Sequence, residues 1–421
     1  MIGSGGREHA LALALSRDPA VDEVHAAPGN PGMVDCASLH QVNPMDGTAV
    51  ASLAAAIGAD LVVIGPEAPL TAGVADAVRN LNLCCFGPSA EAAVIEASKS
   101  FAKDVMAAAD VPTAAARVCA TAEEVAAAVD EFGPPYVVKD DGLAAGKGVV
   151  VTEDRSEALA HASSCGRVVV EEYLDGPEVS LFAITDGSTV VPLQPAQDFK
   201  RIHDGDLGPN TGGMGAYTPL PWVPDDLVEE VRARVLQPTV DEMARRGTPF
   251  CGLLYAGLAL TSRGVRVVEF NARFGDPETQ PLLALLDAST GPGLGTLLLA
   301  AAQGRLHETL QQVGPPRWQD AAAVAVVLAS RGYPASSSPG DVITGVADAS
   351  ALDGVSVIHA GTALAGSGPD QGQLVTAGGR VLAVVGVGPS VAEARARAYA
   401  GASKIDFPGK QCRTDIAAAV D

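Results

Sequence analysis

The sequence has no long apolar run, no paired cysteines and little aromatic content. Aromatic residues make up 4% of its 421 residues, and its 7 cysteines are scattered without a Cys-x-x-Cys pair, so we predict neither a disulfide framework nor a zinc site. The longest aliphatic stretch, residues 321–329, is far shorter than the about 20 residues that cross a bilayer. Glu8 and His9 stand near the start, where a basic leader and a cleavage site are lacking. We therefore expect a soluble, cytoplasmic protein without membrane contact.

Positive charge is also scarce. The chain has 28 Lys and Arg against 50 Asp and Glu, a formal net charge of −22. A nucleic-acid partner would reward clustered positive charge, so we expect no nucleic acid to bind. The negative net charge remains compatible with a local basic pocket for one phosphorylated metabolite. We expect the protein to be a monomer that acts on small molecules.

The first 97 residues alternate strand-like and helical segments, a pattern that predicts a doubly wound parallel sheet. The segments HALALALSRD and AGVADAVRNLN have the character of helices, and DLVVIGPE that of a buried strand. Ligands of such sheets bind beyond the carboxyl ends of the strands. The loops GSGGREH, APGN and IGPEAPL all fall there, and we expect them to converge.

The chain is too long for a single hydrophobic core, and we predict four parts: residues 1–97, 98–180, 181–318 and 319–421. The second is expected to be a small α+β lid, the third a central unit with two long strands, and the fourth a β-rich unit with a mainly structural role. A helix is predicted over residues 225–246, with a kink at Pro238. The predicted fold class is α/β and α+β, in several domains.

Two lysines flank a glycine-rich turn in YVVKDDGLAAGKGVVV. Lys139 ends one strand and Lys147 precedes the next, an arrangement that can clasp phosphate oxygens. A Walker loop is excluded because Gly148 follows Lys147 and the next segment is a strand rather than a helix. Taken alone, an ordinary hairpin with solvated lysines explains this motif equally well.

The segment VVVEEYLDGPEVS carries a buried strand into acidic residues. The backbone of residues 171–174 can meet an adenine edge, and Glu178 can accept hydrogen bonds from ribose hydroxyls. The signal is weak alone, because acidic side chains after a strand are usually solvated.

The segment RVVEFNARFGDPE predicts a metal and phosphoryl-transfer site. The strand period of two puts Glu269, Asn271 and Arg273 on one face, and Val268 and Phe270 on the other. A carboxylate and an amide oxygen suit Mg²⁺, which completes its octahedron with water and phosphates. Arg273 can then meet the charge of a transferring phosphoryl group. The alternative is a solvent-facing strand edge.

The loop AQDFKRIHDGDLGPNTGGMGAYTPLP is long and rich in Gly, Pro, Asn and charge. Such loops are usually functional or disordered. Lys200 and Arg201 offer anion contacts, and the glycines at 212, 213 and 215 let backbone approach a ligand closely. A mobile linker is the competing interpretation.

The glycine turn of GSGGREH leads into a helix, whose free N–H groups favour one phosphate. Because Glu8 occupies the third glycine position of a dinucleotide fingerprint, the turn does not indicate NAD.

These blocks together resemble one family. The sequence motifs are similar to those of the phosphoribosylamine–glycine ligases, which have the ATP-grasp fold. In chain order the motifs are GSGGREHA, PGN, GPEAPL, SKSFAK, GLAAGKGVVV, QDFKR, GPNTGGMGAY and EFNARFGDPE, with HAGT and GGRVL in the tail. GPNTGGMGAY and RFGDPE are the most specific of them. The likeness extends over nearly the whole chain and implies an ATP clamp between lid and central unit.

The resemblance also implies roles for individual residues. It implies that ATP is contacted by the side chains of Lys103, Lys139 and Glu178 and by the backbone of Glu171, Glu172 and Leu174. It implies that the metal is bound by Glu269 and Asn271. Catalytic roles are implied for Arg273 and Lys147. The implied substrate-binding residues are Gly5, Gly6, Arg7, Glu8, Asn30, Glu67, Lys200, Asp206, Asn210, Gly212, Gly213, Met214 and Asp276.

The implied chemistry is activation of the glycine carboxylate by ATP, with Mg²⁺ or Mn²⁺, to an acyl phosphate that the nitrogen of phosphoribosylamine attacks. That route, a step of purine biosynthesis, needs no protein nucleophile, and the sequence offers no convincing Ser-His or Cys-His pair. Two alternatives stay open: another ATP-grasp ligase or carboxylase with a different acceptor, and a non-catalytic nucleotide-binding protein of the same fold.

The sequence departs from the family at three places. Asp140 adds a charge beside Lys139, and Phe199 stands where the family often has a histidine, which argues against an essential imidazole there. Only Met1 and Ile2 precede the first motif, where the family has a full strand, and we expect so short a strand to weaken the centre of the sheet.

Overall fold

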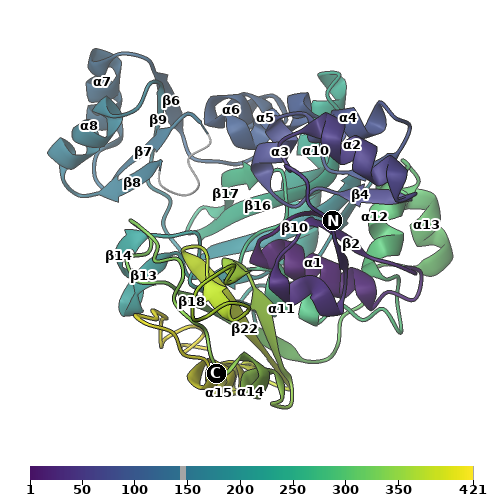
Figure 1. Cartoon of the computed structure of the whole chain (residues 1–421). Helices are drawn as coiled ribbons and strands as arrows, with labels where there is room; N and C mark the ends of the chain where they lie inside the picture. The colour runs from purple at the N-terminus through teal and green to yellow at the C-terminus, as the bar shows by residue number, and fades with distance from the viewer. Residues whose placement is uncertain (143–147, 421) are drawn as a thin grey trace.

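A computed structural model describes residues 1–142 and 148–420 (Figure 1). The N-terminal part is a parallel sheet in the order β3-β2-β1-β4-β5, with Ile2 of β1 bridged to Ile64. Its strands are β1 (Ile2–Gly3), β2 (His25–Pro28), β3 (Ser38–Leu39), β4 (Leu61–Val63) and β5 (Cys84–Phe86). Its helices are α1 (Gly6–Ser16), α2 (Gly47–Ala56), α3 (Glu67–Thr71), α4 (Val74–Arg79) and α5 (Ala90–Ala97). The predicted parallel sheet is confirmed.

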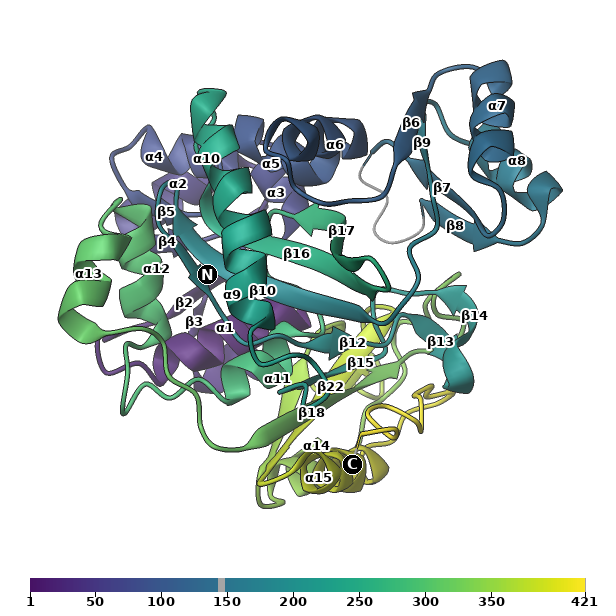
Figure 2. The ribbon, with the colours of Figure 1, turned by 180° about the vertical axis from the view of Figure 1, so that it is seen from behind.

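The lid stands out from the body of the molecule (Figures 1 and 2). After α6 (Lys99–Ala108), an antiparallel sheet runs in the order β6-β9-β7-β8, from β6 (Ala116–Cys119), β7 (Tyr136–Asp140), β8 (Val149–Thr152) and β9 (Val168–Glu171). Helices α7 (Ala122–Phe132) and α8 (Arg155–Ser163) pack on it. Their contact forms a small core that includes Val129, Val138 and Val170.

The central unit is built on the antiparallel sheet β11-β10-β16-β17. Its strands are β10 (Glu178–Asp186), β11 (Val190–Pro192), β16 (Cys251–Thr261) and β17 (Gly264–Asn271). One face packs on the long helix formed by α9 (Leu227–Val231) and α10 (Gln237–Arg245), and the other on α12 (Leu294–Ala302). In Figure 2 the long helix lies across the sheet.

The interruption predicted at Pro238 takes the form of a π-helical turn, Arg232–Leu236, between α9 and α10. Proline has no N–H to donate to the preceding turn, and a wider turn accommodates that loss. Apolar side chains of the long helix face the sheet, with Val231, Val235 and Val240 fully covered.

The C-terminal sheet runs in the order β12-β15-β18-β22-β19. Its strands are β12 (Gln197–Asp198), β15 (Gly215–Thr218), β18 (Ala322–Ala329), β19 (Val355–His359) and β22 (Arg380–Gly388), backed by α14 (Val346–Ser350) and α15 (Val391–Lys404). Two of the five strands therefore come from the segment before residue 319. The four-part division of the chain stays a prediction.

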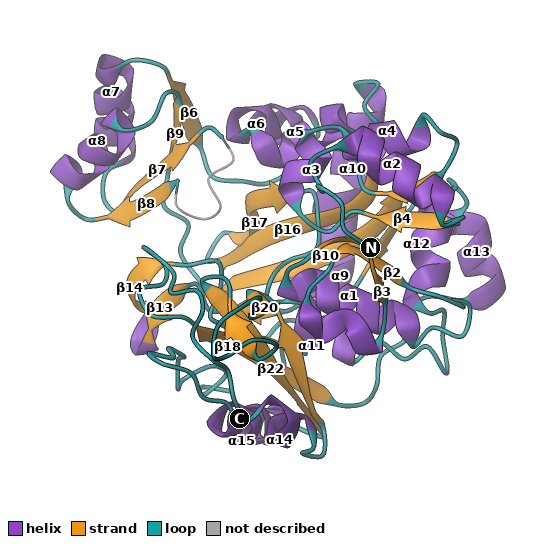
Figure 3. Cartoon of the chain, in the orientation of Figure 1, coloured by secondary structure: helices purple, strands orange, loops and turns teal. Residues whose placement is uncertain are grey.

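Short elements complete the molecule (Figure 3). They are the hairpins β13 (Arg201–His203) with β14 (Leu207–Asn210) and β20 (Thr362–Leu364) with β21 (Leu374–Thr376), and the helices α11 (Thr279–Ala284) and α13 (Leu306–Val313). Across the described residues we find no helix with the length and hydropathy of a membrane span.

Candidate active site

Three charged side chains meet where the lid joins the body. Strand pairing sets Glu171 of β9 opposite Val137 of β7, next to Lys139, and α6 supplies Lys103. The Glu171 carboxylate lies 3.0 Å from the Lys103 ammonium and 2.8 Å from that of Lys139. Lys139 also donates to the carbonyl oxygen of Val268, at 3.0 Å. Lys103 and Lys139, both expected to contact ATP, are thus brought together, with a carboxylate between them.

Burial and charge act against each other in this cluster. Burial alone would raise the pKa of Glu171, but the two ammonium groups hold it below its ordinary value. Burial alone would lower the pKa of Lys139, but Glu171 raises it above the ordinary value. For Lys103 burial prevails, and its pKa is lowered despite Glu171. Lys139 is therefore held as a cation inside the protein.

The predicted adenine segment follows β9. The backbone N–H of Glu172 donates to the carbonyl oxygen of Ala115, at 3.0 Å, so that N–H is already used. The Glu172 carboxylate accepts from the Ala115 N–H and pairs with Arg263, each at 3.1 Å. Leu174 is half-buried. Of the predicted backbone contacts, those beyond Glu172 are the better placed.

Strand β17 carries the predicted metal ligands with a local irregularity. Gly257 of β16 pairs with Glu269 while Leu258 pairs with Val267, which leaves Val268 as an extra residue. This bulge breaks the strict alternation, so that Val267, not Val268, shares the core with Phe270. The expected partition of faces was wrong for Val268.

Glu269 and Asn271 still offer oxygen ligands. Within the described part of the chain, the Glu269 carboxylate is half-buried and has no hydrogen-bond or ion-pair partner. Among the described residues, the Asn271 amide oxygen accepts a single long contact, from Arg273 at 3.4 Å. No group of three or more His, Cys, Asp and Glu side chains in residues 1–142 and 148–420 is arranged to hold a metal. A two-ligand site completed by phosphates and water fits Mg²⁺ or Mn²⁺.

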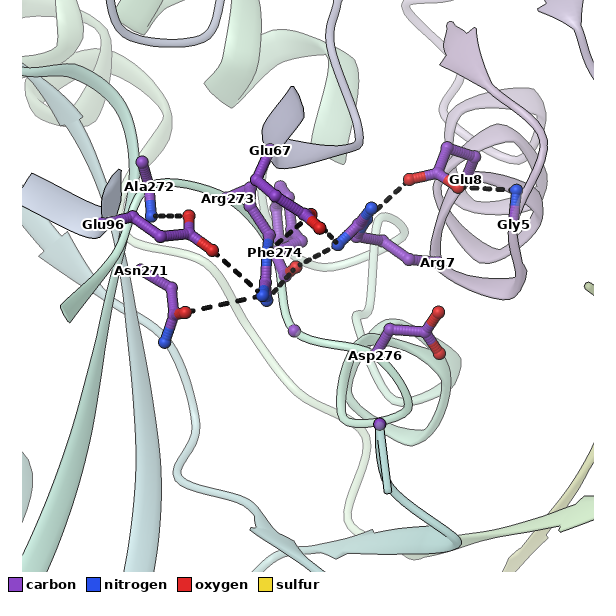
Figure 4. Close-up of polar contacts among 12 residues, drawn as sticks. Gly5, Arg7, Glu8, Glu67, Glu96, Asn271, Ala272, Arg273, Phe274 and Asp276 are labelled. Atoms are coloured by element: carbon purple, nitrogen blue, oxygen red, sulfur yellow. Dashed lines mark hydrogen bonds and ion pairs between the residues drawn. The ribbon is translucent and has the colours of Figure 1, made fainter. Parts of the chain in front are cut away.

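Arg273 follows the end of β17 rather than lying on the strand, and it meets Arg7 at a shared acceptor (Figure 4). Both guanidinium groups donate to the carbonyl oxygen of Phe274, Arg7 at 3.1 Å and Arg273 at 3.3 Å. Arg273 also pairs with Glu67 at 3.3 Å and with Glu96 at 3.1 Å, and Arg7 lies 3.8 Å from Glu67. The predicted residues Arg7, Glu67 and Arg273 therefore form one network.

The two carboxylates around Arg273 differ. Burial raises the pKa of Glu96 despite its contact with Arg273. Burial would also raise the pKa of Glu67, but Arg273 and Arg7 lower it below the ordinary value. Burial alone would lower the pKa of Arg273, but Glu96 and Glu67 raise it above the ordinary value. Glu96 was not predicted, because nothing in its helical surroundings distinguishes it from a solvated acid.

Glu8 covers the glycine turn at the start of α1. Its carboxylate accepts from the Gly5 N–H at 2.7 Å and pairs with Arg7 at 2.5 Å. A Cβ atom on Gly65 would collide with this carboxylate, and one on Gly6 would come within 2.8 Å of Gln280. The Glu8 carboxylate already accepts from one N–H of the turn. Fewer backbone N–H groups are therefore available to bind a phosphate than the sequence indicates.

Asn30 has a structural task. It is buried, and its amide donates to the carbonyl oxygens of Ser4 at 2.8 Å and His359 at 3.0 Å, while its oxygen accepts from the Gly32 N–H at 3.0 Å. Its side chain therefore ties the N-terminal loops to β19.

The long loop predicted at the substrates connects β12 to β15. Lys200 pairs with Glu178. Asp206 pairs with the buried Arg413 at 2.7 Å, and Asn210 lies half-buried on β14. The side chain of Met214 is fully buried, so only its backbone can face a ligand.

The departures at residues 199 and 140 have different surroundings. The Phe199 ring lies under the guanidinium of Arg413, with 5.0 Å between Cζ and the ring centre, and packs near Tyr217. Asp140 ends β7, with its N–H on the carbonyl oxygen of Gly148. Lys147, predicted as catalytic, lies outside the described residues.

Asp276 lies where three predicted loops meet. Its carboxylate accepts from Gln280 at 2.8 Å and pairs with Arg380 at 3.0 Å. Cβ atoms on Gly5 and Gly6 would lie 3.9 and 3.7 Å from its oxygens. Gly213 is close to Pro277, the neighbour of Asp276, at a positive φ of 109° that favours glycine.

Two further buried carboxylates were quoted in motifs but given no role. Glu278 accepts from Tyr255 at 2.8 Å and from Ser180 at 3.3 Å. Burial raises the pKa of Asp198 to about 7, against the opposing effect of Lys200. The motifs GDPE and QDFKR contain them, but no spacing rule indicates that their side chains turn inward.

Comparisons with known proteins agree along the chain. Family models described as phosphoribosylglycinamide synthetase match in three parts, the N domain over residues 1–96, the ATP-grasp (A) domain over 97–279 and the C domain over 323–419. A phosphoribosylamine–glycine ligase of Streptomyces coelicolor is 61% identical over 420 residues, covering 99% of this chain and 98% of the relative. One from Mycobacterium tuberculosis is 54% identical, covering 99% and 96%.

Solved structures give the same picture. The crystal structure of a phosphoribosylamine–glycine ligase from Thermotoga maritima has a TM-score of 0.83 at 34% identity and covers 99% of this chain and 98% of that chain. A biotin carboxylase domain from Hydrogenobacter thermophilus has a TM-score of 0.69 at 16% identity, covering 98% and 90%. The latter likeness shows the fold alone.

Proposed function

The chain belongs to the phosphoribosylglycinamide synthetase family, and we propose that it joins glycine to 5-phosphoribosylamine through the residues described above. The reaction consumes ATP, yields glycinamide ribonucleotide, ADP and phosphate, and is a step of purine biosynthesis. The observation that carries this function is the 61% identity over 99% of the chain to a phosphoribosylamine–glycine ligase. We further propose a cytoplasmic enzyme that acts as a monomer.

The proposed route has two steps. A carboxylate oxygen of glycine attacks the γ-phosphorus of ATP, the bond to the β-phosphate oxygen breaks, and ADP leaves. The nitrogen of phosphoribosylamine then attacks the carbonyl carbon of glycyl phosphate, phosphate leaves, and the nitrogen loses a proton. Neither step forms a bond to the protein, so positioning and electrostatics supply the catalysis.

Lys103 and Lys139 are proposed to bind the ATP phosphates. Lys139 is buried and Lys103 half-buried at the joint between lid and body, and their one carboxylate partner among the residues that the structure describes is Glu171. Two cations that share one carboxylate keep a net positive charge, and this excess favours an anionic phosphate. Glu178, at the start of β10, is proposed to meet the ribose.

Glu269 and Asn271 are proposed to hold the divalent metal, Mg²⁺ or Mn²⁺. The support is that the Glu269 carboxylate, which has no hydrogen-bond or ion-pair partner among the described residues, shares one strand with the Asn271 amide oxygen. Glu269 also adds to the effect of Glu171 in raising the pKa of Lys139. When bound, the metal neutralises phosphate charge during transfer. Both side chains lie on β17, the edge strand of the central sheet.

Arg273 is proposed to stabilise the negative charge that develops on the transferring phosphoryl group. Its ion pairs with Glu67 and Glu96 fix the guanidinium in one orientation. A fixed donor costs no reorganisation during the reaction. The glycine turn at residues 5 and 6, the loop at 212 and 213, and Asp276 are proposed to surround glycine and phosphoribosylamine.

One assay tests the function. ADP release is measured with ATP, Mg²⁺, glycine and freshly generated phosphoribosylamine, omitting each in turn and replacing glycine by bicarbonate. We expect full turnover only with all components. Equal ADP release without glycine would overturn the substrate assignment, and ADP release driven by bicarbonate would indicate a carboxylase of the same fold.

A further inference from the structure

Arg380 is the first residue of β22 and reaches out of the C-terminal sheet. Its guanidinium donates to the carbonyl oxygen of Asp276 at 2.6 Å, to that of Gly213 at 3.4 Å, and to that of Gly212. It also pairs with the Asp276 carboxylate at 3.0 Å. A single side chain therefore joins two loops that are more than 60 residues apart in sequence.

Close backbone contacts bring Arg380 to this position. A Cβ atom on Gly212 would lie 3.0 Å from Cζ of Arg380, closer than side chains pack. On the other side, the Gly361 N–H donates to the carbonyl oxygen of Arg380 at 2.9 Å, and a Cβ on Gly361 would lie 2.7 Å from Cα of Gly378. The tail motifs HAGT and GGRVL thus pack together and aim the arginine at the loops.

The charges explain why an arginine is needed. The carbonyl oxygens of Gly212, Gly213 and Asp276 converge on one point together with a carboxylate, and without a cation these acceptors would repel one another. Nη1 of Arg380 faces the three carbonyl oxygens and Nη2 faces the carboxylate, so one rigid guanidinium reaches both kinds of acceptor. The side chain is 21% exposed, so solvent screens the contact only in part.

The contact also reaches the third loop. The Asp276 oxygen that Arg380 does not pair with accepts from Gln280, and Gln280 packs against Gly6 of the N-terminal turn. Asp276 is therefore held from two sides, between the start of α1 and the C-terminal sheet. The lysines and the metal ligands proposed for ATP make no contact with Arg380 in the part of the chain that the structure describes.

We propose that Arg380 is a positioning residue that holds the Gly212–Gly213 loop and Asp276 in the geometry that binds glycine and phosphoribosylamine. The C-terminal unit then completes the active site rather than serving only as a scaffold. The inference rests on the proposed function for its choice of substrates, and on the contacts alone for the holding of the loops.

The kinetic test compares Arg380→Gln and Arg380→Lys with the control Arg397→Gln. Arg397 also combines a backbone acceptor, the carbonyl oxygen of Val387 at 2.7 Å, with an ion pair to Asp353 at 3.4 Å, but on the far side of the same sheet. We expect Arg380→Gln to lower kcat/KM for glycine and for phosphoribosylamine by about 100-fold, the scale of a 1 Å misplacement. KM for ATP should change less than about twofold. The kcat/KM of Arg380→Lys for glycine should lie between the values of Arg380→Gln and the wild type.

A second readout does not depend on activity. Hydrogen exchange of the amides in residues 211–214 should speed up in Arg380→Gln and stay unchanged in Arg397→Gln. If Arg380→Gln matches the control in both measurements, or loses ATP affinity as much as glycine affinity, the proposal is overturned. If the exchange result holds while the wild-type enzyme releases ADP without glycine, the proposed function fails and the role of Arg380 in holding the loops stands.

Discussion

Lys139 of the lid donates to the backbone carbonyl oxygen of Val268, the residue directly before Glu269, at 3.0 Å. The proposed phosphate contact and the proposed metal ligand are thus linked by one hydrogen bond across the joint between lid and body. A nucleotide that moves Lys139 must also disturb the bulge at Val268. Phosphate binding and metal binding should therefore depend on one another.

Glu171→Gln should destabilise the protein. The substitution removes the counter-charge of two buried ammonium groups, which costs about 3 kcal/mol of unfolding free energy. We expect urea unfolding to show this loss and ATP to restore more stability in the variant than in the wild type, because phosphates replace the missing charge. The neighbouring Glu172→Gln is the control, with an expected loss of less than about 1 kcal/mol.

This loss has a defined pH dependence. The folded-state pKa of Glu171 is lowered, so its contribution is fully present above the ordinary value near 4.5 and disappears as pH falls through the lowered value. The two proteins should differ at pH 7 and converge in acid. A difference that grows in acid would contradict the proposed charge balance.

Glu269→Gln should abolish turnover without unfolding the chain. Its carboxylate has no hydrogen-bond or ion-pair partner within the described ranges, so the amide breaks no direct contact of the fold, yet one metal ligand is weakened. Turnover and ADP affinity are measured over a range of Mg²⁺ and Mn²⁺ concentrations. Glu229→Gln, on an exposed turn of α9 where it pairs with Arg232, is the control. Normal turnover in Glu269→Gln would remove this residue from the metal site.

Arg273→Lys should slow catalysis by about 100-fold, the cost of removing one preorganised donor from a transition state. Lysine keeps the positive charge but cannot reach Glu67 and Glu96 together. Single-turnover ADP formation measures the step directly, with Arg232→Lys as the control. An unchanged rate would show that Arg273 serves only to join the loops.

The contact between His9 and His359 should make stability sensitive to mild acid. The backbone N–H of His359 donates to Nδ1 of the His9 ring at 2.9 Å, and burial lowers the pKa of each ring from 6.5 to about 4. The unfolded chain binds protons that the folded chain does not between these values. Stability is therefore complete above pH 6.5 and falls as pH drops toward 4, by about 3 kcal/mol for each ring at most.

Urea unfolding at several pH values tests this dependence. His359→Gln should roughly halve the slope between pH 6.5 and 4, because His9 still titrates, while His307→Gln, at an exposed position on α13, should leave it as in the wild type. A slope in His359→Gln as steep as that of the wild type would assign the acid sensitivity to other groups.

Local patterns predicted much of the architecture. The alternation of strand-like and helical segments predicted the parallel sheet of the first 97 residues. The prediction that Glu269 and Asn271 share one face of a strand was correct, because the strand continues to Asn271. The bulge at Val268 could not be predicted, because it depends on pairing with β16 rather than on composition. For the same reason the ion pair between the Glu171 carboxylate and Lys139 could not be predicted, since only the pairing of β7 with β9 brings the two side chains together.

Long-range contacts account for the rest. Glu96 and Arg273 are far apart in sequence, as are Arg380 and Asp276, and no periodicity connects such pairs. The tail was given a mainly structural role because its strands hold few polar residues, yet Arg380 and Arg413 both reach from it to loops proposed at the substrates. A residue at the end of a strand can serve a distant loop without leaving any pattern in its own segment.

The C-terminal sheet takes its strands β12 and β15 from residues 197–218. In a chimera that exchanges only the last hundred residues with a relative, strands β18, β19 and β22 would come from one protein and β12 and β15 from the other. The junction between the two proteins would fall where β15 pairs with β18. Gene fusions, splits and domain exchanges in this family should therefore succeed only when residues 197–218 are transferred together with residues 319–421. Evolution of the tail is tied in the same way to the loop between those two strands.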